Sequence, residues 1–310
     1  MEMKLRKHIF PRRWCDILCF LLIALFLPPI ALFDLVIVVP ATHPPGEFMH
    51  NFIFTLGVFL FTNIYGNMFA TMMVDTSVNA IDLDSVTPLN PRAKGWYTCK
   101  HCLRLVPPRS YHCKVFSISA CKTCILKRDH HCVFTGCCIG HYNFRFFALF
   151  LFYMFIGSAI SIGYLTYYMF WVHANIFLRF LSFYKMICPM LMALDGGIWN
   201  NLPLIFYNLN IVAIVLSSIL LVYHWIPIIK GSTSYERRLN YPYGRDLYTN
   251  LSSIFGKRMY LVWLSPFLSS KLLQDGANWD DEKGIPLVRL SRHRNKRQRM
   301  LRSTRRTISD

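Results

Sequence analysis

The sequence predicts an all-α polytopic membrane protein with four transmembrane helices and a cysteine-rich domain between the second and the third. Its 310 residues are 54% hydrophobic and only 16% charged, and the mean hydropathy is +0.33. Soluble chains carry roughly 25% charged residues. The uncharged residues gather in four stretches of about 20 residues or more, the length that a membrane-spanning helix needs. This composition excludes a purely cytosolic or purely secreted enzyme.

The four stretches are residues 17–39, 52–74, 148–172 and 203–229, and the last two contain no Asp, Glu, Lys or Arg. The first contains Pro28, Pro29 and Asp34. A proline pair removes helix hydrogen bonds, so we expect a kink there. We expect Asp34 at the far membrane interface rather than against another helix, because a charge inside the bilayer is costly. The stretch is too long for a cleaved signal peptide and is expected to remain as an anchor.

The distribution of basic residues predicts the orientation, because cytosolic loops hold Lys and Arg in excess. The chain carries five before the first span, none before the second, ten before the third, two before the fourth and seventeen after it. This pattern places both termini and the cysteine-rich loop in the cytosol. Residues 177–194 are apolar but contain Arg179, Lys185 and Pro189. We expect a lumenal interfacial or re-entrant helix there, since a fifth span would move the basic C-terminal region to the lumen.

The resulting organisation has five parts. They are a cytosolic N-terminus (1–16), spans 1 and 2 (17–74), a cytosolic cysteine-rich domain (75–147), spans 3 and 4 with a lumenal loop (148–229), and a cytosolic C-terminal region (230–310). Residues 289–306 form a basic tail with few apolar positions. We expect this tail to contact anionic membrane lipids, at about 1 kcal/mol per basic residue. Nucleic acid is not an expected partner, because no base-reading module accompanies the tail.

Cysteines are concentrated in the loop between spans 2 and 3, where eight of the 11 in the chain lie between Cys99 and Cys138. A reducing cytosol disfavours disulfides, and two Cys-x2-Cys pairs with histidines nearby are typical of tetrahedral zinc sites. Two Cys3His sites leave a surplus of cysteine and histidine. The loop has little apolar core, so metal binding is expected to contribute much of its folding free energy. One interpretation is that every Cys and His is a ligand or spacer in a zinc-braced adaptor.

The tetrapeptide Asp129-His130-His131-Cys132 favours chemistry as well. A cysteine becomes a nucleophile as the thiolate, and an imidazole oriented by a carboxylate can remove its proton. Asp129, His130 and Cys132 are candidates for these roles, and His131 is then free to bind zinc and to fix the turn. The residue types alone leave the catalytic and the ligand-only interpretations open.

These motifs resemble the DHHC-type protein S-acyltransferases, or palmitoyltransferases, which are four-span membrane enzymes with a cytosolic zinc-binding loop. The resemblance extends over Cys99-x2-Cys102, the Pro-x-Arg-x2-His-Cys run at residues 107–113, the run at residues 121–132 that ends in the quartet, and Cys138-Ile139-Gly140-x2-Asn143. Residues 106–110 and those after Cys132 are most similar to the branch of zinc finger DHHC domain-containing protein 24. After the fourth span, residues 233–236 resemble the family's Thr-Thr-x-Glu motif, with Ser234 in place of the second Thr, and residues 250–256 resemble its C-terminal Asn motif.

The resemblance implies a site, a reaction and a set of partners. It implies two structural zinc ions, one bound by Cys99, Cys102, His112 and Cys124, the other by Cys113, Cys121, His131 and Cys138. Cys132 is the implied nucleophile, His130 its general base and Asp129 the group that orients His130. Palmitoyl-CoA is the implied donor, with its acyl chain in a cavity among the spans, and protein substrates with cytosolic cysteines are the acceptors. By the same analogy the membrane is that of the endoplasmic reticulum or Golgi.

The chain departs from the family pattern in two places. Most members follow the nucleophile with Pro-Trp and then Asn-Asn-Cys, whereas this chain has Val133, Phe134, Thr135, Gly136 and Cys137 before Cys138. Cys137 is a rival zinc ligand or a spare thiol, and we favour Cys138 on its spacing from Cys132. The segment between Cys113 and Cys121 has seven residues where the family has two, with residues 116–120 as the extra segment. We expect this insertion to loosen the second zinc site, at a modest cost in loop closure.

Three further expectations concern the alternatives and the remaining polar residues. A DHHC-like binding or regulatory protein without catalysis is the main alternative, and a zinc cross-brace ubiquitin ligase is a weaker one, since it leaves Asp129 and His130 unexplained. Lys127 and Arg128 are expected to contact the phosphates of CoA. His101, His141 and His224 have no evident partner and are expected to be structural.

Overall fold

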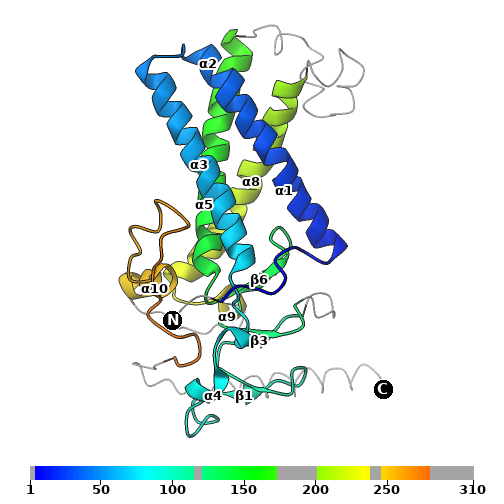
Figure 1. Cartoon of the computed structure of the whole chain (residues 1–310), viewed down its shortest axis with the longest axis vertical. Coiled ribbons are helices and arrows are strands. Elements are labelled where there is room, and N and C mark those ends of the chain that lie inside the picture. Colours follow the sequence, from blue (N-terminus) through cyan, green and yellow to red (C-terminus); the bar gives the residue numbers. More distant parts are fainter. Residues whose placement is uncertain (1–3, 115–120, 173–200, 238–245, 280–310) are drawn as a thin grey trace, which may run out of the picture.

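The computed structural model describes residues 4–114, 121–172, 201–237 and 246–279, and its helices stand as an upright bundle above a small irregular domain (Figure 1). Within these residues four helical segments are long and apolar enough to cross a membrane. The first comprises α1 (Trp14–Phe33), a π-helical segment (Asp34–Val38) and α2 (Val39–Thr42); the others are α3 (Phe48–Met73), α5 (Phe144–Tyr167) with a π-helical end (Tyr168–Val172), and α8 (Leu202–Ile229). The predicted four-span architecture is confirmed.

The third span begins four residues earlier than expected. The expected boundary was late because it was drawn from uncharged residues, and the first turn of the helix contains a buried cation. Arg145 is 2% exposed, and its guanidinium donates a hydrogen bond to the Ser270 carbonyl at 3.0 Å and lies over the Phe146 ring. A search for uncharged residues excludes Arg145, but the folded chain satisfies its charge with a carbonyl and an aromatic face.

The first span differs from expectation at Asp34. Helix α1 continues through Pro28 and Pro29, and the irregularity is the π-helical segment that begins at Asp34. The Ser161 hydroxyl on α5 donates to the Asp34 carboxylate at 2.5 Å, and the Asn210 amide on α8 donates to Ser161 at 2.9 Å. The expectation that Asp34 does not lie against another helix is therefore wrong. This carboxylate faces other helices and joins three spans, in the way that intramembrane polar groups are usually satisfied.

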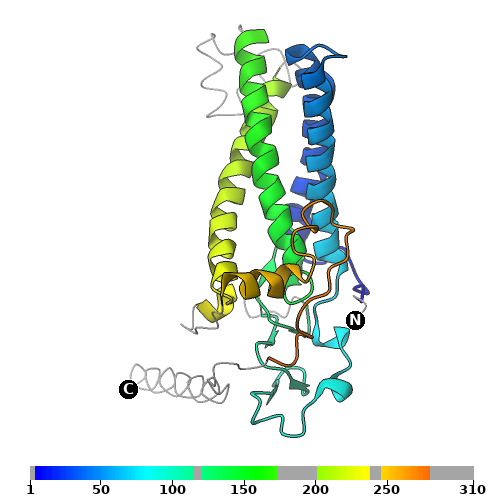
Figure 2. The ribbon, with the colours of Figure 1, turned by 90° about the vertical axis from the view of Figure 1, so that its left-hand side faces the viewer.

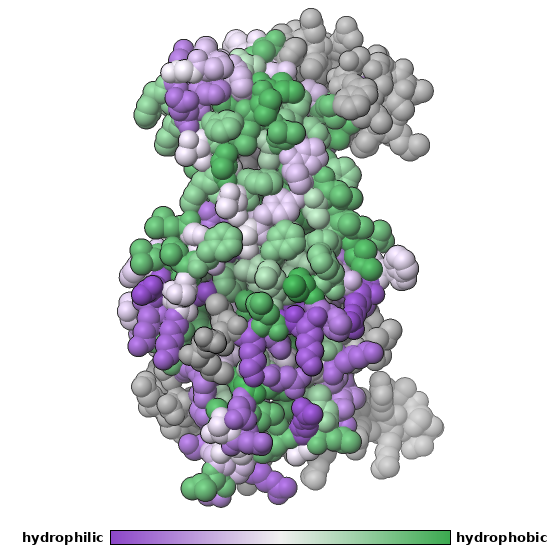
Figure 3. Space-filling view, viewed as in Figure 1, coloured by the Kyte–Doolittle hydropathy of each residue, from purple (hydrophilic) through white to green (hydrophobic). Residues whose placement is uncertain are grey.

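The loop between α3 and α5 combines short antiparallel strand pairs with a cluster of buried apolar side chains that includes Val78, Ile81, Trp96, Val106 and Leu126. The expectation that this loop has little apolar core is therefore wrong. The pairs are β1 (Tyr97–Thr98) with β2 (Leu105–Val106), β3 (Tyr111–His112) with β4 (Cys124–Ile125), and β5 (His130–Cys132) with β6 (Cys137–Ile139). One short helix, α4 (Leu83–Val86), precedes them. Apolar side chains gather over the helical bundle, and hydrophilic ones gather below it over this domain (Figure 3).

The segment after α8 returns to the lower end of the bundle. It contains α9 (Ser234–Arg237) and α10 (Leu247–Phe255), and α10 lies across the base of the bundle in both ribbon views (Figure 2). Further on, the Asp275 carbonyl accepts a hydrogen bond from the Tyr142 hydroxyl at 2.6 Å, which ties this segment to the cysteine-rich domain. Both ends of the described chain contact this domain, since the Lys4 carbonyl accepts from the Asp75 amide at 2.9 Å and the Trp279 ring lies 5.5 Å from the His141 ring. The interfacial helix expected at residues 177–194, the basic tail at 289–306 and the insertion at 116–120 lie outside the described residues.

We predict that Gly231→Ala destabilises the protein, because Gly231 has φ of +65° and a Cβ there would meet the Asn250 side-chain amide. That amide donates to the Ile229 carbonyl at 2.8 Å and so secures the end of α8. The backbone conformation alone costs roughly 1 kcal/mol for a residue with a Cβ. The measurement is thermal unfolding in detergent. Gly163→Ala in α5, where nothing lies within 4 Å of the added carbon, is the matched control. Equal stability of the two variants would contradict the prediction.

Candidate active site and metal centres

The first group of candidate metal ligands joins two strand pairs. It comprises Cys99, Cys102, His112 and Cys124, whose ligand atoms all lie within 4.8 Å of one another. His112 and Cys124 are opposite each other in the β3–β4 pair, and His112 Nδ1 lies 3.2 Å from the Cys102 sulfur and 3.9 Å from that of Cys124. Three sulfurs and one imidazole nitrogen form the donor set that tetrahedral zinc prefers.

The second group has the same donor set and comprises Cys113, Cys121, His131 and Cys138, again within 4.8 Å of one another. His131 Nδ1 lies 3.5 Å from the Cys121 sulfur and 3.8 Å from the sulfurs of Cys113 and Cys138. The donors therefore converge despite the longer segment between Cys113 and Cys121. The Cys137 sulfur lies elsewhere, 3.4 Å from the Thr135 hydroxyl and 3.6 Å from the Thr71 carbonyl.

A carboxylate from the first membrane helix supports this second group. Asp16 Oδ2 lies 3.1 Å from His131 Nε2, and the Asp16 side chain is 2% exposed. A proton on Nε2, donated to Asp16, leaves Nδ1 as the free lone pair directed at the three sulfurs. Such an outer carboxylate fixes the tautomer and the ring orientation of a histidine ligand. Nothing in the sequence near the cysteines indicates Asp16.

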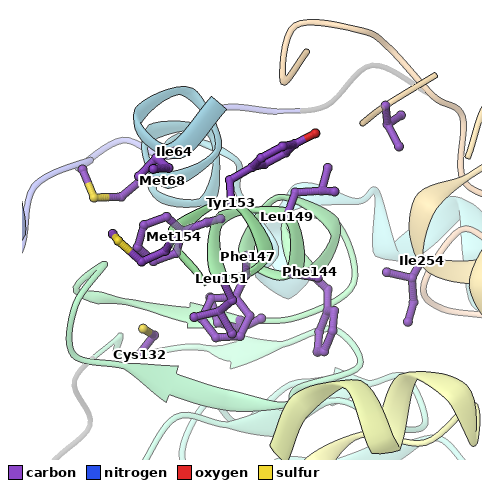
Figure 4. Close-up of a cluster of buried hydrophobic side chains, with 14 of the residues drawn as sticks. Ile64, Met68, Cys132, Phe144, Phe147, Leu149, Leu151, Tyr153, Met154 and Ile254 are labelled. Atoms are coloured by element: carbon purple, nitrogen blue, oxygen red, sulfur yellow. The ribbon is translucent and has the colours of Figure 1, made fainter. Parts of the chain in front are cut away.

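The β5–β6 pair separates ligand from nucleophile by the alternation of its side chains. Successive residues of a strand point to opposite faces. His131 and its opposite residue Cys138 therefore share the face toward the metal group, while His130 and Cys132 share the other face. Cys132 is 6% exposed and belongs to the apolar cluster of Met68, Leu151 and Met154 at the lower end of the bundle (Figure 4).

Asp129 receives polar contacts from three parts of the chain. The His130 imidazole donates from Nδ1 to Oδ2 at 2.7 Å, the Ser234 amide donates to Oδ1 at 2.5 Å, and His224 Nδ1 lies 3.3 Å from Oδ2. Burial alone raises the pKa of the Asp129 carboxyl, but the contacts from His130 and His224 outweigh it and hold that pKa well below its usual value. Asp129 is thus a buried, ionised carboxylate.

The electrostatics of His130 and Cys132 follow from the same burial. Desolvation lowers the pKa of His130, against the opposing effect of Asp129. Desolvation raises the pKa of the Cys132 thiol, against an opposing hydrogen bond with Thr135. Burial thus favours a neutral imidazole and a protonated thiol. Because Asp129 occupies His130 Nδ1, the ring's other nitrogen, Nε2, is the one that can accept a proton.

The first of the two motifs after the fourth span, residues 233–236, holds the loop against the end of the bundle. Arg109 makes a bidentate ion pair with Glu236, with distances of 2.6 and 2.7 Å, and also donates to the Gly231 carbonyl at 3.2 Å. Both side chains are buried, at 6% and 1% exposure. The Thr233 amide donates to Glu236 at 2.9 Å, which completes the environment of this carboxylate.

The two cations expected at CoA phosphates are placed differently. Lys127 is 7% exposed, its ammonium lies 5.3 Å from the centre of the Trp279 ring, and burial lowers its pKa to about 7. For Arg128, burial lowers the pKa, but the neighbouring sulfurs of Cys138 and Cys113 outweigh this and raise it. Lys127 is therefore an interior residue, and Arg128 lies beside the second metal group.

Asp16 and His224 are the site residues that the sequence did not indicate. An ionisable residue within a membrane helix is by default a candidate for function. That rule could have singled out His224, which lies in α8 and is 3% exposed. Asp16 precedes the predicted first span, and only its fold-dependent contact with His131 distinguishes it from the other carboxylates outside the predicted spans.

The comparisons with known proteins agree with this geometry. Residues 92–240 match the family described as DHHC palmitoyltransferase. Over 255 residues the chain is 30% identical to probable palmitoyltransferase ZDHHC24 of Mus musculus, covering 80% of this chain and 85% of that protein. It is 31% identical over 243 residues to the Homo sapiens protein of the same name, covering 76% and 81%. It is 30% identical over 195 residues to probable protein S-acyltransferase 13 of Arabidopsis thaliana, covering 61% and 55%. With four spans, paired Cys3His groups and the Asp129-His130-His131-Cys132 quartet between spans 2 and 3, the chain belongs to the DHHC palmitoyltransferase family, in the ZDHHC24 branch, and is an acyltransferase.

Proposed function

We propose that this protein moves a long-chain acyl group, typically palmitoyl, from acyl-CoA to cysteines of other proteins through a thioester on Cys132. The observation that carries the proposal is the position of Cys132. It shares a strand face with His130, which is hydrogen-bonded to the buried Asp129, and its side chain lies in the apolar cluster at the end of the membrane helices. A thiol and a base thus stand on one strand face, beside an apolar environment for a fatty chain.

In the first step the Cys132 sulfur attacks the thioester carbon of acyl-CoA while His130 Nε2 accepts the thiol proton. The bond from the acyl carbon to the CoA sulfur breaks, and CoA leaves as its thiol with that proton. In the second step an acceptor cysteine gives its proton to His130 and attacks the same carbon, and Cys132 regains a proton. Asp129 holds Nδ1 of His130 and stabilises the imidazolium that forms in each step.

The pKa directions fit a nucleophile that is activated only when it reacts. Burial raises the pKa of Cys132 and lowers that of His130, so the resting pair is a thiol and a neutral imidazole. The thiolate forms as the proton moves to His130. A permanently ionised thiolate is the form that oxidants attack most readily, so this arrangement also limits side reactions.

A cavity among the helices supports the placement of the acyl chain that we propose. A cavity between the four spans is lined mostly by apolar side chains, and Ile64 and Met154 belong both to this lining and to the cluster around Cys132. Asp34, Ser161 and Tyr164 lie on the same lining. We propose that the chain enters beside Cys132 and extends along this cavity, where each buried CH2 contributes roughly 0.8 kcal/mol.

We further propose that each Cys3His group binds one zinc ion, with the ligands named above. Thiolate and imidazole donors suit zinc, and the Asp16 contact fits an outer partner of a ligating His131. Bound zinc contributes folding free energy to a domain of two- and three-residue strands. In this proposal both termini and the domain face the cytosol of the endoplasmic reticulum or Golgi, where acyl-CoA, substrate proteins and membrane lipids are the partners.

The first prediction of this proposal is that Cys132→Ser abolishes autoacylation of purified protein by labelled palmitoyl-CoA. The wild-type label is expected to be released by neutral hydroxylamine, because it is a thioester. Cys137→Ser, a buried cysteine in the same hairpin outside the metal groups, is the matched control and is expected to retain the label. A wild-type protein that binds two zinc ions but takes no label would support the inactive binding protein instead.

The second prediction is that Asp16→Ala weakens the second zinc site. Loss of an outer carboxylate typically costs 10–100-fold in metal affinity, so we expect zinc to pass to a chromogenic chelator about that much more readily from one of the two sites. The exposed carboxylate variant Asp84→Asn is the control. Identical release from both variants and the wild type would show that Asp16 does not support a zinc ligand.

The third prediction concerns Lys127→Met. Because Lys127 is buried, the acyl-CoA concentration for half-maximal autoacylation is expected to stay unchanged. The pKa of Lys127 falls from 10.5 to about 7 in the fold, so the unfolded chain binds the proton more tightly than the folded chain does. The free energy of unfolding of the wild type therefore decreases as the pH falls between these two values. The variant's gain in melting temperature over the wild type is therefore expected to be larger at pH 7 than at pH 9.5. Lys94→Met, at an exposed position, is expected to show no such difference. A higher half-maximal acyl-CoA concentration in Lys127→Met than in the wild type would show that Lys127 contributes to acyl-CoA binding.

A further inference from the structure

His224 of α8 lies against both members of the Asp129–His130 pair. Its Nδ1 is 3.3 Å from Asp129 Oδ2 and 3.3 Å from the Ser234 hydroxyl. Its ring stacks on the His130 ring, with centres 4.4 Å apart and planes at 26°. The side chain is 3% exposed. His224 belongs to none of the sequence motifs described above.

The surroundings of His130 leave its ring little freedom. His224 covers one face, and the Phe147 ring approaches the His130 and His224 rings edge-on at 5.0 Å in each case. Asp129 holds the Nδ1 edge at 2.7 Å. These contacts fix the plane and the rotation of the His130 ring. They therefore also fix the direction of Nε2, the ring nitrogen that is not hydrogen-bonded to Asp129.

We infer that His224 is a positioning residue for the acyl transfer, which orients the His130 imidazole and the Asp129 carboxylate with respect to Cys132. The inference rests on the proposed function. His224 acts through His130 and Asp129 and does not touch the reacting sulfur. Its hydrogen bond steadies the carboxylate oxygen that also accepts from His130, and its flat ring prevents His130 from tilting. Because His224 belongs to a membrane helix, it sets the base in register with the bundle that holds the acyl chain.

A third metal site is the competing explanation, since the ligand atoms of Asp129, His130 and His224 lie within 4.8 Å of one another. The ring geometry disfavours it. Imidazole binds a metal through a lone pair in the plane of the ring, so an ion bound to both rings would have to lie in both planes. Two rings stacked at 26° with centres 4.4 Å apart lie in nearly parallel planes that do not meet near the rings. The contact of 2.7 Å between His130 and Asp129 is also a hydrogen-bond distance.

The test measures the autoacylation rate of the detergent-solubilised full chain at several palmitoyl-CoA concentrations. His224→Ala removes both contacts, His224→Phe keeps the flat ring without the donor, and His224→Asn keeps a donor near the Nδ1 position without the ring. We expect the maximal rate of His224→Ala to fall about 10- to 100-fold, as for a base misplaced by a fraction of an ångström to 1 Å. The half-saturating palmitoyl-CoA concentration is expected to stay within about twofold, and Phe and Asn are expected to recover part of the rate. Val222→Ala, on the exposed face of α8, is the control.

Several results would overturn the inference. They are a wild-type rate in His224→Ala, a changed half-saturation with an unchanged maximal rate, or no recovery in either Phe or Asn. Three zinc ions in the wild type and two in His224→Ala, measured by elemental analysis, would replace it with a metal site. A wild type without hydroxylamine-labile label would remove the proposed function itself. A labelled wild type with unaffected His224 variants would remove only the role of His224.

Discussion

The arrangement of the site depends on the two-residue period of one short strand. In β5, His130 and Cys132 point to one face and His131 points to the other. A helix would not separate neighbouring side chains in this way, because adjacent residues lie only 100° apart around its axis. The strand instead directs a candidate metal-ligand histidine into the polar domain and a thiol toward the apolar helices. Anything that fixes the ring of His131 therefore also fixes the position of Cys132, one residue away.

The second constraint is the position of this strand relative to the helical bundle. Two buried carboxylates fix that position. Glu236 receives both arms of Arg109, and Asp129 receives the Ser234 amide and contacts from two histidines. Removing one partner of a buried ion pair leaves an uncompensated charge, which typically destabilises the folded state by about 3–5 kcal/mol. The loop is therefore attached to the segment after α8 by charged, directional contacts that tolerate little displacement. The apolar cluster around Cys132 is less directional, so these contacts determine where Cys132 lies within it.

The sequence was informative where the governing property is local. Span length and charge-free composition identify the membrane helices, and Cys-x2-Cys spacing indicates zinc-binding chemistry. The division of the donors between the two groups came from the family resemblance, because Cys121 and Cys124 of one Cys-x2-Cys pair belong to different groups. The sequence was uninformative where a contact joins distant segments. Asp34 was placed at the interface because its partner Ser161 is 127 residues away, and Asp16 was missed because His131 is 115 residues away. Lys127 lies next to a cation in a polar segment, but only the fold brings Trp279 over it and excludes water.

Asp129 is contacted by a neighbour in its own loop, by a histidine of the fourth membrane helix and by a backbone amide beyond that helix. The proposed catalytic unit is consequently not contained in one continuous segment of the chain. A cysteine-rich segment moved into another membrane scaffold would retain its metal ligands and its thiol, yet it would lack two of the three groups around its carboxylate. Chimaeras between relatives are therefore expected to remain functional only when the loop and the end of the last membrane helix that meets it come from the same parent.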